Sequence, residues 1–238
     1  MDAGASARQT LGPMSAAKLL PCVEIEPRKK AQWSVIWLHG LGADGNDFAS
    51  VPPYLGIDAR HDVRFVLPHA PSIPVTLNGG MVMPAWYDIR DGDLRTRHDE
   101  AGIARSMADV RALIAREVER GVPNNHVLLA GFSQGGAIAV HTALRHAQPL
   151  AGVIALSTYL VCGDKLPAEL ESANRAIPVF AAHGTHDPMV HLKRGQDLRD
   201  TLTGLGCRVE WHTYPMEHSV CMEELAHIGA WMNRVLGA

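Results

Sequence analysis

The chain has 238 residues, of which 47% are hydrophobic and 20% charged, a balance typical of one globular α/β domain with a sizeable core. Its formal net charge is −3 and both signs are mixed along the sequence, which argues against a surface for nucleic acid or for an anionic membrane. No apolar run approaches the roughly 20 residues of a membrane helix, so we expect no integral membrane segment.

The cysteines and the N-terminal residues bear on the cellular compartment. The four cysteines lie far apart and lack zinc-binding spacing, so we expect reduced thiols and no metal site. Residues 1–17 lack the continuous apolar stretch of a signal peptide. We interpret them as a disordered lead-in, or as an artefact of start-site choice with Met14 as an alternative start, and we interpret residues 18–238 as one domain. A cytoplasmic location is the expectation.

Short apolar, β-branched runs alternate with longer helical patterns, which predicts parallel strands joined by helices. In chain order, the expected strands are Trp33–His39, Val63–Leu67, His126–Ala130, Gly152–Leu156, Pro178–His183 and Arg208–Tyr214, with Cys22–Glu26 as a candidate edge strand. The expected helices are Glu100–Arg120, Ser133–His146 and Glu223–Leu236. The second of these is apolar nearly all round, as a helix buried at the centre of such a fold should be.

The stretch from Pro68 to Arg97 follows neither a helical nor a strand period and is rich in Pro and Gly. A loop of this length in a compact domain is usually functional or disordered. Disorder is the weaker interpretation, because disordered segments are poor in apolar residues of the kind found here, Met81, Val82, Met83, Trp86 and Tyr87. We therefore expect an ordered covering loop at about 68–97, beside a binding cleft.

A G-x-S-x-G pattern, Gly131-Phe132-Ser133-Gln134-Gly135, stands where a predicted strand passes directly into a predicted helix. That context is typical of a nucleophile elbow, a sharp turn that projects a serine hydroxyl above the sheet. Glycines are needed at both ends of the pattern because side chains there would collide with the neighbouring strand and helix. The alternative is a glycine-rich loop whose serine only caps the helix.

A serine nucleophile needs a base, and the base needs an orienting acid that precedes it in the chain order of α/β-hydrolases. Asp187 follows the end of a predicted strand, where the catalytic groups of open α/β sheets gather. An Asx turn before Pro188 is a compatible role for the same residue. Asp164 lacks such a strand before it, and Asp197 and Asp200 fall in a helical pattern.

The histidines that follow this acid are few. His218 comes after the last predicted strand and just before the final helix, where a loop histidine can hang over the elbow. His212 lies within a predicted strand and His227 within a predicted helix, so both are better explained by packing or surface exposure. His191 is too near the acid in sequence to come from a different loop. We therefore expect His218 to be the base.

Negative charge that develops on a substrate carbonyl oxygen needs oriented N–H donors. One should be the backbone N–H of Gln134, the residue after the serine at the start of the helix. The other should come from His39-Gly40-Leu41-Gly42, where glycines on both sides let the Leu41 N–H turn inward. This loop has neither dinucleotide-binding glycine spacing nor a Walker lysine, so phosphate binding is the weaker interpretation.

With these residues in place, the chain resembles the phospholipase/carboxylesterase family of α/β-hydrolases, which includes acyl-protein thioesterases and bacterial carboxylesterases. The resemblance runs from about Leu19 to the C-terminus and rests on LHGLGADG, PHAPSIPVTLNGGMVMPAWYDI, DEAGI, GFSQGGAIA, ALSTYL, HGTHDPMV and YPMEHS in that order. It implies an α/β-hydrolase fold with a mostly parallel central sheet and helices on both faces. It also implies a Ser133, Asp187 and His218 triad with Leu41 and Gln134 as oxyanion donors.

In this family the segment matching Pro68–Asp88 forms part of the substrate-binding wall. The candidates for acyl contact are therefore Leu77, Met83 and Trp86.

Two departures from the family pattern stand out. Glu217 precedes the base where a methionine is common, and its charge would disfavour anionic substrates or shift the pKa of the histidine. Thr158 and Tyr159 stand where a Cys-Trp pair is frequent.

These features predict a serine carboxylesterase that needs no cofactor and no metal and that works through an acyl-serine intermediate. The expected partner is a small ester or an acylated molecule, with acyl thioesters and lysophospholipids as extensions, and not nucleic acid; a homodimer stays open. The competing hypothesis is a non-catalytic ligand-binding protein on the same fold. The complete set of nucleophile, acid, base and donors argues against it.

Overall fold

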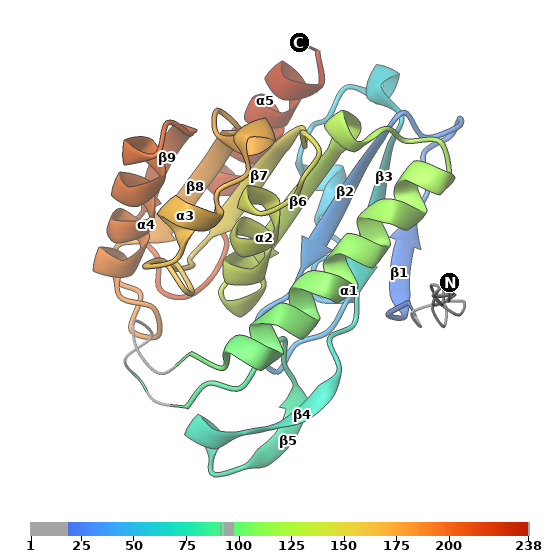
Figure 1. Ribbon diagram of the computed structural model, residues 1–238. Coiled ribbons are helices and arrows are strands. Elements are labelled where there is room, and N and C mark those ends of the chain that lie inside the picture. The colour runs from blue at the N-terminus through green and yellow to red at the C-terminus, as the bar shows by residue number, and fades with distance from the viewer. Residues whose placement is uncertain (1–18, 91, 93–97, 238) are drawn as a thin grey trace, which may run out of the picture.

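The computed structural model describes residues 19–90, 92 and 98–237. The predicted lead-in at 1–17 lies outside these residues, and so do residues 91 and 93–97 of the predicted covering loop. A seven-stranded sheet stands at the centre, in the order β1-β3-β2-β6-β7-β8-β9 (Figure 1). Its strands are β1 (Cys22–Ile25), β2 (Trp33–Leu38), β3 (Val63–Pro68), β6 (Val127–Phe132), β7 (Gly152–Leu156), β8 (Pro178–Gly184) and β9 (Arg208–Tyr214).

The sheet is parallel except at one edge, where β1 pairs antiparallel with β3. Helices cover both faces, so the inner strands are apolar on both sides. In β2, Ile36 and Leu38 enter one core and Val35 and Trp37 enter the other. This arrangement confirms the predicted mostly parallel sheet with helices on both faces.

One face carries α1 (Glu100–Glu119), α2 (Gln134–Leu144), the single turn α3 (Leu166–Glu169) and α4 (Leu192–Gly204), and the opposite face carries α5 (Met222–Leu236) (Figure 1). Every residue of α2 is buried, as its composition predicts. Short 3-10 turns occur at Pro52–Tyr54, Ala59–His61, Thr76–Asn78, Asn124–His126 and Ser172–Asn174. Among the described residues, no helix has the length and apolar character needed to cross a membrane.

The predicted covering loop contains regular structure that the sequence pattern did not reveal. β4 (Ser72–Val75) and β5 (Met81–Pro84) form a separate antiparallel hairpin. It projects beyond the carboxyl-terminal ends of β2 and its parallel neighbours (Figure 1). Pro74 and Pro84 lie within these strands, and proline is unusual in a strand except at an edge or a bulge, so the sequence does not read as a hairpin here.

Candidate active site

The predicted elbow joins β6 to α2, with Ser133 as the single residue between them. The Ser133 backbone has φ 54° and ψ −121°, a strained combination for a residue other than glycine. A Cβ atom on Gly131 would collide with the backbone of Gly135, and one on Gly135 would collide with the backbone of Leu38 and His39. The two glycines therefore allow β6 and α2 to approach closely enough to form the turn.

The predicted acid and base contact each other at the carboxyl ends of β8 and β9. His218 Nδ1 donates to Asp187 Oδ2 at 2.6 Å, and the other oxygen of Asp187 accepts from the N–H groups of Met189 and Val190 at 2.9 and 2.8 Å. Burial raises the pKa of Asp187, but the hydrogen bonds from His218 and Val190 outweigh it, so the pKa lies below its usual value. Asp187 is thus a carboxylate that holds the imidazole by Nδ1, and Nε2 has no hydrogen-bond partner among the described residues.

The loops that carry this pair are themselves bound together. The N–H groups of Thr185 and His186 donate to the carbonyls of Tyr214 and Met216, at 2.8 and 3.1 Å. Gly184 lies so close to the second loop that a Cβ atom would collide with the carbonyls of Met216 and Glu217. The separation of acid and base is therefore fixed by the backbone.

The His218 ring lies beside the elbow. It packs against Phe132, the residue before Ser133, with ring centroids 4.6 Å apart. Within the described part of the chain, no hydrogen bond joins Ser133 Oγ to this ring, and such catalytic bonds often shorten only when substrate binds. The structure thus brings the predicted base and acid into contact and places the ring next to the residue that precedes the predicted nucleophile.

Both predicted oxyanion donors adjoin the elbow. The Gln134 N–H begins α2, and a Cβ atom on Gly40, next to Leu41, would lie 3.5 Å from Ser133 Cβ. Neither the Leu41 N–H nor the Gln134 N–H has a backbone or side-chain acceptor among the described residues, so both are available to a bound oxygen.

Trp86 braces these two donors from inside the protein. Its Nε1 donates to His39 O at 2.8 Å, and its backbone N–H donates to Gln134 Oε1 at 2.9 Å. The Gln134 amide in turn donates to Tyr87 O at 2.7 Å. Only 1% of Trp86 is exposed, so the prediction that it contacts the acyl chain does not fit. The hydrogen bond to His39 O offsets the cost of burying the indole N–H.

The other two candidates for substrate contact belong to the hairpin segment. Leu77 is 48% exposed in the turn between β4 and β5. Met83 Sδ accepts from Asn78 Nδ2 at 3.3 Å and would lie 3.9 Å from a Cβ atom on Gly42, in the loop of the Leu41 donor. Met83 therefore adjoins the oxyanion loop, and an acyl-contact role for either residue stays a prediction.

Two buried histidines support the site, although the sequence patterns did not assign them a role. His39 Nε2 accepts from the Ala70 N–H at 3.0 Å, so its proton is on Nδ1, which donates to Gly40 O at 2.7 Å. Burial lowers the pKa of His39, consistent with this neutral form. His183 Nε2 donates to Val190 O at 2.7 Å and so holds the acid loop. Each histidine ends a strand predicted from the sequence and is followed by a glycine, and this pattern could have pointed to both residues.

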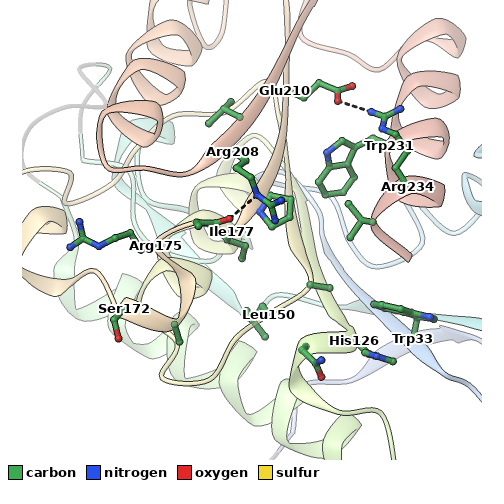
Figure 2. Close-up of a pocket in the computed structure, with 17 residues that line it drawn as sticks. Trp33, His126, Leu150, Ser172, Arg175, Ile177, Arg208, Glu210, Trp231 and Arg234 are labelled. Atoms are coloured by element: carbon green, nitrogen blue, oxygen red, sulfur yellow. Dashed lines mark hydrogen bonds and ion pairs between the residues drawn. The ribbon is translucent and has the colours of Figure 1, made fainter. Parts of the chain in front are cut away.

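A groove of about 940 Å³ lies elsewhere, at the amino-terminal ends of β2, β8 and β9. Its cationic side chains do not converge: Arg208 donates to Ala176 O at 3.0 Å, Arg234 pairs with Glu210 at 2.6 Å, and Arg175 points away from both (Figure 2). None of the predicted site residues lines it. The candidate active site therefore lies at the opposite, carboxyl-terminal ends of the strands.

Comparison with known proteins agrees with this architecture. The sequence profile of the phospholipase/carboxylesterase family matches residues 21–236. The chain belongs to this family. Acyl-protein thioesterase 1 of Neurospora crassa is 46% identical over 202 residues, covering 81% of this chain and 82% of the relative. Acyl-protein thioesterase 1 of Cryptococcus neoformans var. neoformans serotype D is 38% identical, covering 90% of this chain and 97% of the relative.

Solved structures of similar proteins share the fold. Acyl-protein thioesterase 2 of Zea mays has a TM-score of 0.82 at 27% identity, covering 91% of this chain and 99% of that one. SOBER1 of Arabidopsis thaliana has a TM-score of 0.80 at 28% identity, covering 87% and 100%. The predictions of an α/β-hydrolase fold and of an enzyme are confirmed: the protein is a serine hydrolase that acts on esters.

Proposed function

We propose that this hydrolase cleaves carboxylic esters and acyl thioesters through an acyl intermediate on Ser133. The observation that carries the proposal is the 2.6 Å hydrogen bond from His218 Nδ1 to Asp187, beside an elbow that holds Ser133 at positive φ. The thioester part is supported by the relatives named acyl-protein thioesterases.

The reaction follows from the free nitrogen of the base. Ser133 Oγ attacks the substrate carbonyl carbon while His218 Nε2 takes the hydroxyl proton, and Asp187 stabilises the imidazolium. The carbonyl oxygen becomes an oxyanion that accepts from the N–H groups of Leu41 and Gln134. His218 then protonates the leaving alcohol or thiol as the acyl-serine forms. A water molecule gives a proton to His218 Nε2 as it attacks the acyl carbon. His218 then returns this proton to Ser133 Oγ as the acid is released.

The substrate side is proposed to lie at the β4–β5 hairpin, whose exposed apolar residues suit an acyl chain better than a charged group. Met81 and Val82 are 63% and 65% exposed. Glu217 is exposed next to the base and adds negative charge at the mouth of the site, so neutral substrates should be preferred over anionic ones.

A cytoplasmic location belongs to the same proposal. All four cysteines, Cys22, Cys162, Cys207 and Cys221, are free thiols. Free thiols are the usual state in a reducing compartment.

Covalent labelling tests the nucleophile directly. A fluorophosphonate probe should label the wild type at Ser133, and Ser133→Ala should lose both labelling and hydrolysis. A series of p-nitrophenyl esters from acetate to palmitate, measured beside an acyl thioester, should then define the acyl chain. A wild type that hydrolyses none of these substrates and takes up no probe would refute the proposal.

A further inference from the structure

The strand next to the elbow holds the nucleophile by its backbone. The Ser133 N–H donates to Leu156 O, the last residue of β7, at 2.9 Å. Two residues later, the Thr158 hydroxyl donates to Ser133 O at 2.6 Å. Thr158 is only 2% exposed, so this hydrogen bond is protected from water. Both polar backbone atoms of Ser133 therefore bond to the end of β7 or to the turn that follows it.

The local backbone is shaped so that this hydroxyl can reach. Ser157 has φ 44°, in the left-handed region that residues other than glycine rarely occupy. This turn brings Thr158 against the first turn of α2, where a Cβ atom on Gly136 would lie 2.8 Å from Thr158 Cβ. A strained residue before Thr158 and a glycine opposite it indicate a tightly determined position.

The bond to Ser133 O acts on more than the serine. Ser133 C=O and Gln134 N–H belong to one planar peptide unit and point in opposite directions. A donor that fixes the carbonyl oxygen therefore also fixes the direction of the N–H. It also polarises the peptide, because hydrogen bonds in a chain strengthen one another. The Ala137 N–H bonds to the same oxygen at 3.1 Å, so that atom has two donors.

We infer that Thr158 is a positioning residue for the oxyanion site. Its hydroxyl orients and polarises the Ser133–Gln134 peptide so that the Gln134 N–H meets the charge that develops on the substrate oxygen. The inference rests on the proposed roles of Ser133 and Gln134. A cysteine at this position would supply only a weak S–H donor.

The test compares Thr158→Val, which keeps the shape of the side chain and deletes the donor, with Thr158→Ser, which keeps the donor. With p-nitrophenyl butyrate, we expect kcat of Thr158→Val to fall about 10-fold with KM nearly unchanged, less than the 10²–10³ fold for loss of a whole oxyanion donor. The affinity for a trifluoromethyl ketone, which adds to the serine as an oxyanion, should fall by the same factor. Thr158→Ser should stay near the wild type in both measurements.

Fluorophosphonate labelling separates this inference from the proposed function. If the wild type is not labelled at Ser133, the proposed function is refuted, and the role of Thr158 that rests on it is refuted as well. If the wild type is labelled but a folded Thr158→Val matches it in kcat and in ketone affinity, the role of Thr158 alone is overturned. Should Thr158→Val fail to fold, Thr158→Cys decides: we expect lower kcat at constant KM, and equal kcat overturns the inference.

Discussion

At the scale of single residues, the Leu41 N–H is a donor that one substitution can remove. Leu41→Pro deletes this N–H, and we expect kcat for a p-nitrophenyl ester to fall about 10²–10³ fold, the usual loss for one oxyanion donor. Leu41→Ala keeps the N–H and should stay close to the wild type. Unchanged turnover in a folded Leu41→Pro protein would exclude Leu41 from the role.

Trp86→Phe tests the internal brace on the donors. The substitution removes the hydrogen bond to His39 O and leaves a buried carbonyl short of a donor, which should lower the free energy of unfolding by about 1–3 kcal/mol. We expect kcat to fall with KM unchanged for every ester in the acetate-to-palmitate series. A change in acyl-chain preference would instead indicate that Trp86 contacts the acyl chain.

The hydrogen bond of the Trp86 indole also shows what could not be predicted from the sequence at this scale. The pattern G-x-S-x-G and the order of acid and base along the chain predict Ser133, Asp187 and His218, because those signals are local. The partner of the Trp86 indole is the His39 carbonyl, 47 residues away. A backbone acceptor has no signature in the sequence, so the sequence assigns Trp86 to the substrate-binding wall together with the rest of its segment.

At the scale of elements, what the sequence predicts depends on how each element is buried. The inner strands and α2 are buried on all sides, so continuous apolar runs predict them to within a few residues. The β4–β5 hairpin is four residues per strand, largely exposed on β5 and interrupted by prolines. Its pairing depends on the turn and on contacts with the rest of the domain, and neither produces a periodic pattern in the sequence.

The hairpin is proposed to be the acyl-binding element, and Leu77 tests it. Fully burying a leucine contributes about 1.5–3 kcal/mol, and about half of Leu77 is exposed and could be covered by a long acyl chain. Leu77→Ser should therefore lower kcat/KM for p-nitrophenyl palmitate by about 3–10 fold. The acetate ester should be unaffected. Val118→Ser, an exposed apolar position near the end of α1, is the matched control. Equal losses for acetate and palmitate would argue against acyl contact.

At the scale of the whole molecule, one buried carboxyl couples stability to pH. Glu224, in the first turn of α5, is 0% exposed, and burial raises its pKa to about 8. The pKa of Glu224 is higher in the folded protein than in the unfolded chain. The contribution of this residue to the free energy of unfolding is therefore complete below the unfolded pKa near 4.5 and declines as pH rises toward about 8. The decline should reach several kcal/mol, since each pKa unit corresponds to about 1.4 kcal/mol.

Glu224→Gln removes this titration. Its free energy of unfolding, measured in urea at pH 4.5, 6 and 8, should match the wild type in acid and exceed it at pH 8. Glu223→Gln changes an exposed carboxyl in the same turn and should show no such trend. A stability difference between Glu224→Gln and wild type that is the same at every pH would contradict the assignment.

The order of strands in the sheet has a consequence for biosynthesis. From β6 outward, β7, β8 and β9 are laid down in the order in which the ribosome makes them. The residues proposed as acid and base, Asp187 and His218, are therefore translated only after β8 and β9, long after the elbow serine. Under the proposed mechanism, a product terminated before His218 would carry the serine without its base and should lose most of its hydrolytic activity.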